Sequence, residues 1–218
     1  MIHSLGTDQV LFIVGALRWT VALAALSLLL GGAAGFAVAI ARVSPLRGLR
    51  WLAGAYVGVI QGVPALMLLF LAYYGLSLAG LELPPLAAAA VSLAFYVSGY
   101  LADIWRGAIQ SVPWQQWEAS GSLGLTRAQQ FRYVVLPQAV RIATPPTVGF
   151  AVQAVKNTSI VSIVNVVEVA RAGQLVNNTT YEPFRVYGLV ALLYFAICWP
   201  MSLLAARLER RLDVRSPR

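Results

Sequence analysis

The sequence predicts an all-α membrane protein with five transmembrane helices. Of its 218 residues, 59% are hydrophobic and only 11% are charged, and the mean hydropathy is +0.73, whereas a soluble domain is about half apolar and a quarter charged. Long apolar runs alternate with short polar or basic connections. At about 20 residues per span, the chain accommodates a single transmembrane domain over residues 1–218 and no separate soluble domain.

The composition also excludes several classes of enzyme. The only histidine is His3 and the only cysteine is Cys198, so we expect no disulfide, no histidine-ligated zinc site and no Ser-His-Asp triad. Lys156 is the only lysine and follows Val155, which rules out the Gly-Lys core of a phosphate-binding loop. We therefore expect a chain that is not an enzyme, binds no metal or cofactor, and leaves any ATP hydrolysis to a partner.

Five apolar runs define the expected spans. The first, residues 21–40, is interrupted only by Ser27, and the second, residues 51–81, contains Gln61 as its one strongly polar residue. Each run is long enough to cross a hydrocarbon core of roughly 30 Å. Three further runs follow, and the expected spans are residues 18–42, 50–81, 86–110, 138–170 and 185–207.

Basic residues cluster on one side of these spans. Arginines follow the first and fifth spans and precede the fourth, whereas the loops on the opposite side hold few of them. The clustered arginines are Arg42, Arg47, Arg50, Arg127, Arg132, Arg141, Arg207, Arg210, Arg211, Arg215 and Arg218. The positive-inside rule makes this side the cytoplasm, so we expect an outside N-terminus and a cytoplasmic C-terminus. We therefore interpret the net charge of +8 as a result of the arginines that set the membrane orientation, and we expect no nucleic acid partner.

The second span is too long for a straight helix. Residues 51–81 would form a helix of about 46 Å, well beyond the hydrocarbon core. Pro64 lacks an N–H and clashes one turn back, while Gly62 tolerates unusual dihedral angles. We expect the helix to break at Gln61-Gly62-Val63-Pro64.

The fourth span is also over-long, and its polar interruption is Lys156-Asn157-Thr158-Ser159. Measured along ideal helices from the cytoplasmic side, Gly62 lies about 18 Å deep and Lys156 about 22 Å deep. Paired breaks near mid-bilayer point to a transport site. The alternative is a proline kink plus a lysine that pairs with a neighbouring carboxylate or carbonyl.

The third span carries a polar stripe. Its members fall within about 80° of one another on a helix, so this face should avoid lipid. They are Ser92, Tyr96, Gly99, Asp103, Arg106 and Gln110. Asp103 and Arg106 are three residues apart near the cytoplasmic end, and we expect them to form a structural ion pair that anchors the helix.

Residues 111–137 predict a compact cytoplasmic helix-turn-helix module. Pro113 opens the first helix, and Gly124 can end it in the left-handed conformation. Thr126 and Gln129 have the spacing of a capping box for the second helix, which Pro137 should end. The alternative is an amphipathic connector lying in the membrane interface.

This stretch resembles the EAA signature of the permease subunits of bacterial ABC importers. The matching residues are Glu118, Ala119, Ser120, Gly124, Val134, Leu136 and Pro137, with Ser120 and Val134 replacing the usual alanine and isoleucine. The flanking segments resemble the polar amino acid branch of that family (histidine, glutamine and arginine permeases). These segments are residues 62–66, 96–106 and 156–159, and the resemblance extends over roughly residues 15 to 205.

The resemblance implies a type I importer-like permease that couples to cytoplasmic ATPases. By analogy, the first helix of the module is the coupling helix. The implied ATPase-coupling residues are Glu118, Ala119, Ser120, Gly124 and Leu125. The implied partners are ABC ATPase subunits, a second permease subunit that is identical or related, and an extracytoplasmic solute-binding protein.

Residues at the two breaks are the candidates for contact with substrate. Lys156 is the expected partner of a substrate carboxylate, because a desolvated cation needs an anion and Glu168 lies about 18 Å further along if the helix continues. Three positions depart from the family pattern, since Gln61, Val63 and Asp103 stand where Arg, Thr and Glu are common. The expected substrate-binding residues are Gly62, Val63, Pro64, Lys156, Asn157, Ser159 and Glu168.

The expected function is that of a permease subunit for L-amino acids or similar small polar solutes in a bacterial inner membrane. Alternating access would be powered by the ATPase partner. The alternative is a secondary transporter or channel for small polar solutes that works without an ATPase. Such a protein would share the broken helices but would have no use for the capped module.

Overall fold

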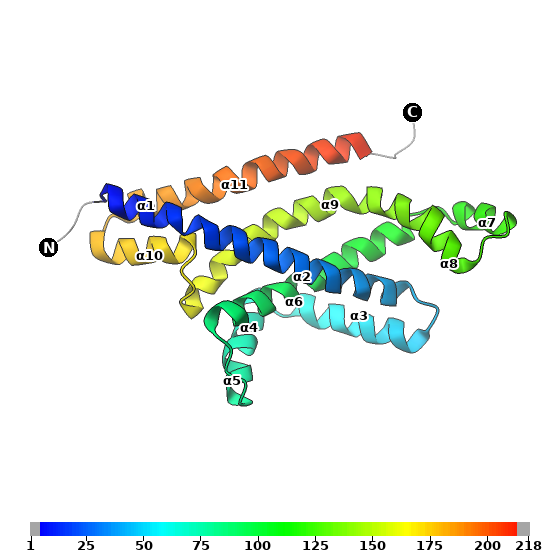
Figure 1. The fold of residues 1–218 in the computed structure, drawn as a ribbon, viewed down its shortest axis with the longest axis horizontal. Coiled ribbons are helices and arrows are strands. Elements are labelled where there is room, and N and C mark those ends of the chain that lie inside the picture. Colours follow the sequence, from blue (N-terminus) through cyan, green and yellow to red (C-terminus); the bar gives the residue numbers. More distant parts are fainter. Residues whose placement is uncertain (1–4, 213–218) are drawn as a thin grey trace.

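The computed structural model describes residues 5–212, and every regular element in this range is helical. His3, Arg215 and Arg218 lie outside the described residues. Figure 1 shows an elongated bundle in which the long helices run roughly along one axis. These helices are α2 (Leu17–Val43), α3 (Arg47–Gly62), α6 (Pro85–Gln110), α9 (Leu136–Asn157) and α11 (Pro183–Leu212).

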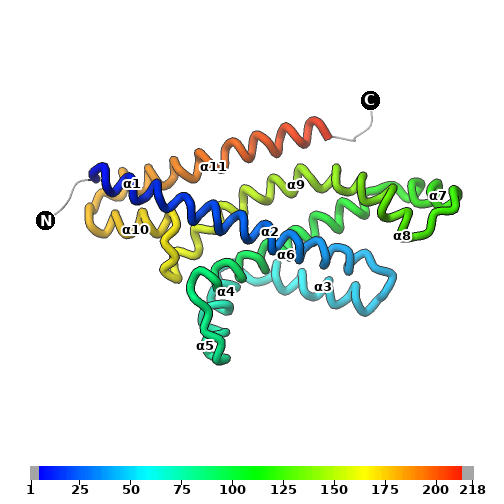
Figure 2. Tube along the Cα trace, viewed as in Figure 1, coloured from blue at the N-terminus to red at the C-terminus, as the bar shows by residue number. Residues whose placement is uncertain are grey.

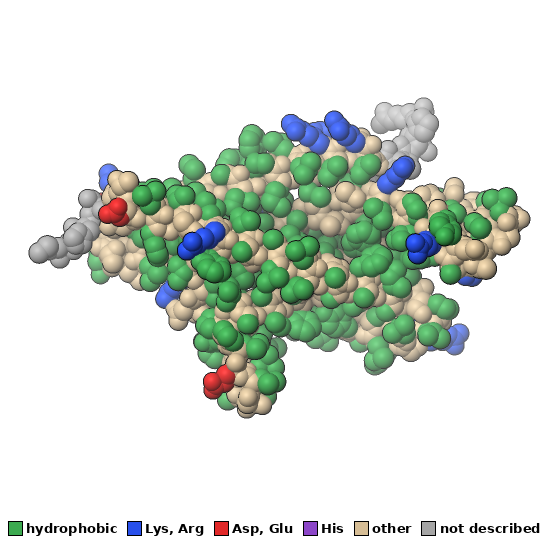
Figure 3. Space-filling view, in the orientation of Figure 1, with side chains coloured by type: hydrophobic (Ala, Val, Ile, Leu, Met, Phe, Trp, Pro, Cys, Tyr) green, Lys and Arg blue, Asp and Glu red, His purple; other side chains and the backbone are tan. Residues whose placement is uncertain are grey.

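The bundle contains the expected number of candidate spans. Four stretches within residues 5–212 are long and apolar enough to cross a membrane, and a bent helix pair provides a fifth candidate. The four are Thr7–Val43, Pro85–Gln110, Arg127–Val164 and Pro183–Leu212, and the bent pair is Arg47–Gly62 with Ala65–Leu78. Figure 3 shows that hydrophobic side chains cover most of one face. Exposed Leu29 and Leu192 are typical of this surface, which suits contact with lipid.

The first span begins earlier than the expected residue 18. Helix α1 (Thr7–Gly15) leads almost directly into α2. Ile13 and Ala16 are buried against Val186 and Val190 of α11. This tertiary contact stabilises α1, whose residues are not needed to reach the length of one membrane span.

Helices α2 and α6 approach each other through glycines. A Cβ on Gly31 would lie 2.5 Å from the carbonyl oxygen of Ala94, and one on Gly35 would lie 2.8 Å from that of Ser98. Any larger residue would push the helices apart. This small-residue spacing of four is typical of closely packed transmembrane helices.

The second span bends sharply at the predicted place. Helix α3 ends at Gly62, α4 (Ala65–Phe70) begins after Pro64, and the two arms differ in direction by 103°. Figure 2 shows the chain leaving the bundle axis here, through a π-helical turn (Leu71–Gly75) and α5 (Leu76–Leu78). The excess length of residues 50–81 is therefore accommodated by a bend and not by tilt.

Pro137 does not end the second helix of the module, which corrects the sequence prediction. Helix α8 (Arg127–Gln130) continues through a π-helical turn (Phe131–Val135) into α9. A π turn widens the helix immediately before the proline, where the ring would otherwise meet a carbonyl one turn back.

The fourth span is shorter than the expected residues 138–170 at its far end. After Asn157 the helix tightens into a 3₁₀ segment (Thr158–Val164), and Asn165 adopts a left-handed conformation with φ of 63°. The chain then turns into a separate helix, α10 (Val169–Thr180). Glu168 is therefore not a continuation of the span, because it caps the next helix.

Candidate functional site

The two predicted breaks lie close together in space. Leu66 and Leu69 of α4, just after the first break, pack in one hydrophobic cluster with Ile160 and Val161 of the 3₁₀ segment that follows the second. Leu93 of α6 belongs to the same cluster. Segments about 95 residues apart in the sequence thus meet beside the first third of α6, as expected if both line a common chamber.

Helix α6 supports both breaks with its predicted polar stripe. Gly99 leaves room for Ile60, because a Cβ there would lie 2.5 Å from the Ile60 side chain, and the Gln61 side chain donates to the Gly99 carbonyl over 3.4 Å. On the side of α9, the Tyr96 ring stacks on that of Phe150 with centroids 6.0 Å apart. These stripe residues are therefore packed against protein, whereas Gln110 at the end of α6 is exposed.

The first break exposes backbone. Gly62 and Pro64 are exposed, and no atom lies within 4 Å of a Cβ placed on Gly62. The N–H of Val63 still donates to the Val59 carbonyl over 3.1 Å, but the last carbonyls of a helix have no partner within it. The bend therefore presents backbone acceptors on an open surface.

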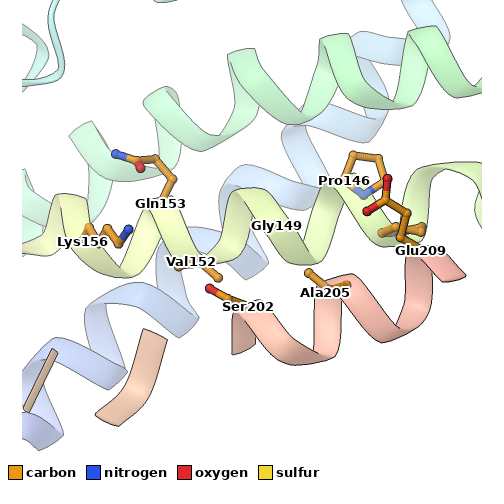
Figure 4. A pocket seen from close by; sticks show the side chains of 10 residues that line it. Pro146, Gly149, Val152, Gln153, Lys156, Ser202, Ala205 and Glu209 are labelled. Carbon is orange, nitrogen blue, oxygen red and sulfur yellow. The ribbon is translucent and has the colours of Figure 1, made fainter. Parts of the chain in front are cut away.

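The residues of the second break do not all face the same way. Lys156 is exposed and lines a groove between α9 and α11, with Gln153 one turn away (Figure 4). Asn157 accepts a hydrogen bond of 3.2 Å from Gln153, and Ser159 donates back to the Lys156 carbonyl over 2.8 Å. The structure thus assigns Lys156 to the groove and ties the other polar side chains to their own helix.

Glu168 lies apart from both breaks and is fully buried. Its carboxylate accepts hydrogen bonds from the Ala170 and Arg171 amides at 2.9 and 2.8 Å and from the Tyr194 hydroxyl at 2.6 Å. Burial raises the pKa of this carboxyl group above its usual value, and the hydrogen bonds oppose that rise. Its partners occupy both carboxylate oxygens, so the geometry gives Glu168 a structural role in joining α10 to α11.

Asp103 forms the expected contact with Arg106, at 3.0 Å, and a second one with Arg42, at 2.6 Å. Arg42 comes from the end of α2, so the carboxylate links two helices. The sequence did not suggest this partner. Arg42 was interpreted only as one of the arginines that indicate the cytoplasmic side, and it lies 61 residues from Asp103 along the chain. Thr20 and Tyr194, the side chains that meet Glu168, carried no signal in the sequence either.

The capped module projects from one end of the bundle, which we call the module end (Figure 1). It comprises α7 (Trp114–Ser122), the following turn and α8. Gly124 ends α7 with φ of 78°, and the Leu125 amide reaches back to the Ser120 carbonyl over 3.3 Å, as in a Schellman motif. Thr126 and Gln129 form the expected capping box.

The module is fastened to the bundle by an apolar cluster. Buried Val112 and Val135 pack with Ile109 of α6, and Trp117 of α7 lies against them. Of the implied coupling residues, Glu118, Ala119 and Gly124 are exposed, whereas Ser120 is buried and Leu125 is partly buried. The module therefore has a held face and a free face. This arrangement can pass a rigid-body movement to α6 and α9.

Within residues 5–212, no group of three or more His, Cys, Asp or Glu side chains is placed to hold a metal ion. The described features are a bundle of apolar helices, two breaks that meet beside α6, and a rigid module at one end. Together they define a membrane transport protein.

Comparison with known proteins identifies the family. Residues 28–214 match the family described as binding-protein-dependent transport system inner membrane component. The chain belongs to this family. Similar proteins include the probable amino-acid ABC transporter permease protein YckA of Bacillus subtilis, 32% identical over 92% of this chain and 88% of the relative. Another is the probable glutamine ABC transporter permease protein GlnM of the same organism, 38% identical over 82% of this chain and 83% of the relative.

Solved structures agree with the fold. The crystal structure of an amino acid ABC transporter with histidines matches with a TM-score of 0.86 and 32% identity, over 92% of this chain and 94% of that one. An inward-facing form of the MetNI methionine ABC transporter matches with a TM-score of 0.72 and 19% identity, over 92% of this chain and 94% of that one. At that lower identity the second match speaks for the fold alone.

Proposed function

We propose that this chain is the transmembrane permease subunit of an ATP-driven ABC importer for L-amino acids or similar small polar solutes. Relatives that cover most of its length are described as amino-acid or glutamine ABC transporter permeases. The similar solved structure is an amino acid ABC transporter with histidines. The chain has no ATP site of its own in this proposal, and a partner subunit hydrolyses the ATP.

The observation that carries the proposal is the way the module joins the bundle. Its exposed face, with Glu118 and Gly124, is free to seat in a partner, while Trp117 holds its other face against the cluster at the ends of α6 and α9. Closure of the ATPase pair would move the module as a rigid body. Because α8 continues into α9 without a stop, the movement would reach Lys156 directly.

The transport cycle is alternating access around the two breaks. Two permease subunits, identical or related, face each other across the path, and an extracytoplasmic solute-binding protein delivers the amino acid. Gly62 and Val63 offer backbone acceptors at the first break, beside Pro64, whose own carbonyl already accepts from the Met67 and Leu68 amides. Lys156 offers the cation for the substrate carboxylate, with Asn157 and Ser159 beside it. Glu168, which is buried and fully hydrogen-bonded, is left outside the proposed path.

The orientation in the bacterial inner membrane follows from the arginines. The module end carries Arg42, Arg47 and Arg50 together with the end of α11, so it faces the cytoplasm under the positive-inside rule. The N-terminus then lies in the periplasm and the C-terminus in the cytoplasm.

Co-purification tests the proposal. Gly124→Val forces a branched residue into a left-handed turn, so it should abolish recovery of the ATPase with the chain. Gly48→Val is the matched control, because a Cβ there meets nothing within 4 Å, and it should retain the ATPase. Uphill uptake by vesicles that contain this chain without any ATPase would contradict the proposal and favour a secondary transporter.

A further inference from the structure

A groove of about 520 Å³ runs between α9 and α11, inside two of the candidate spans. Its floor is made of small residues, so it stays open along its length. Figure 4 shows Lys156 and Gln153 near one end and Glu209 beside Pro146 at the other. Among the lining residues the small ones are Gly149, Ser202, Ala205 and Ala206.

The two ends of the groove differ in chemistry. Lys156 and the Gln153 amide can donate hydrogen bonds at one end, and the Glu209 carboxylate can only accept them at the other when ionised. The three ion pairs found within residues 5–212 involve neither Lys156 nor Glu209. Both charges are therefore available to a ligand.

Two prolines of α9 line the groove at the Glu209 end and supply no N–H donor there. Pro145 and Pro146 have no N–H, so the carbonyls of Arg141 and Ile142 lose their usual donors within the helix. The nearby Thr144 hydroxyl is already committed to the Val140 carbonyl, at 2.6 Å. Of these acceptors the Glu209 carboxylate is the one that lines the groove, and it favours an ammonium group as its ligand.

We propose that this groove is the exit route of the amino acid, with Glu209 as a second station that receives its ammonium group. The inference rests on the proposed function. Lys156 holds the carboxylate first, and the 11 residues from Pro145 to Lys156 place the two stations about 16 Å apart. In an amino acid the carboxylate and α-ammonium groups are bonded to the same carbon atom. One molecule therefore cannot contact both stations at once, and the stations act in succession. The route favours zwitterionic and cationic amino acids over acidic ones.

Charged thiol reagents test the groove independently of amino acid transport. Ala205→Cys, in a Cys198→Ser background, places the only thiol on the groove wall of the assembled complex in membranes. Trimethylammonioethyl methanethiosulfonate is the cationic probe, and sulfonatoethyl methanethiosulfonate is the anionic one. We expect the cationic probe to react about tenfold faster, because residue 205 lies one helical turn from the Glu209 carboxylate, which attracts a cation and repels an anion.

Two further variants assign that preference to Glu209. Adding Glu209→Gln should bring the two rates close to each other, whereas Glu209→Asp should preserve the difference. The matched control is Glu82→Gln, which removes an exposed carboxylate elsewhere and should leave the ratio of rates unchanged.

The outcomes separate the groove from the proposed function. No reaction at the Ala205→Cys thiol, or a ratio that Glu209→Gln does not alter, overturns the exit route even if the complex imports amino acids. A Glu209-dependent preference in a complex that imports no amino acid supports the polar groove and overturns the proposed function instead.

Discussion

The Tyr194 hydroxyl donates a hydrogen bond of 2.6 Å to the carboxylate of Glu168, a residue that is fully buried. The contact joins α11 to the start of α10. Thr20 of α2 completes it, because its hydroxyl accepts from the Val169 amide over 3.2 Å. Helices α2, α10 and α11 are therefore tied to one buried carboxylate at the end of the bundle opposite the module.

Tyr194→Phe should destabilise the protein without altering its shape. The substitution removes one hydrogen bond to a buried carboxylate, although the same oxygen keeps its bond from the Ala170 amide, and a hydrogen bond to a charged group contributes about 1.5–3 kcal/mol. The only thiol belongs to Cys198 and is buried, so a thiol-reactive fluorogenic dye reports thermal unfolding directly. Tyr187→Phe is the control, because Tyr187 is largely exposed. Equal melting curves for the two variants would remove Tyr194 from the network.

The buried carboxyl group should also make stability depend on pH. Burial raises the pKa of Glu168 in the folded state. At pH values between the ordinary pKa of about 4.3 and the raised pKa, the folded state therefore binds more protons than the unfolded state. Its contribution is therefore full below the ordinary value and is lost as the pH rises through the raised one. Wild type should lose stability relative to Glu168→Gln over this window. Parallel pH profiles for the two proteins would be inconsistent with a raised pKa.

Lys156→Met should abolish the ATPase stimulation that substrate produces in the assembled complex. The change removes the cation that faces the groove and keeps a similar side-chain length. Assembly and basal ATPase activity should stay the same, because Lys156 makes no ion pair in the described chain. Lys156→Arg should keep part of the stimulation. Unchanged transport kinetics in Lys156→Met would exclude the residue from the mechanism.

Gly31→Ala should weaken the packing of α2 on α6. Its Cβ would meet the Ala94 carbonyl at 2.5 Å, and overpacking of this kind costs about 1–3 kcal/mol. Gly32→Ala is the matched control, since its nearest neighbour would be Leu101 at 3.7 Å. That change should stabilise the helix by about 0.5–1 kcal/mol. Melting temperatures from the Cys198 dye assay distinguish the two, and a stabilising Gly31→Ala would contradict the close approach.

The sequence predicted those features that depend on local chemistry. Gly124 was expected to end α7 in the left-handed conformation, and Thr126 with Gln129 to cap α8, because turn and cap geometry depends on a few adjacent residues. The bend near Pro64 was predicted for the same reason. The prediction for Pro137 was wrong, because a π-helical turn that relieves the proline clash has no signature in these residues.

The amino-acid sequence by itself therefore determined the membrane fold, the number of candidate spans, the module and the position of the breaks. Apolar length, proline, glycine and capping residues act over one or two helical turns, so they can be read along the chain. Only the tertiary structure decided that the chain turns at Asn165, that Glu168 is buried against Tyr194, and that Lys156 shares a groove with Glu209. These relationships join residues on different helices, and the packing of those helices sets their distances.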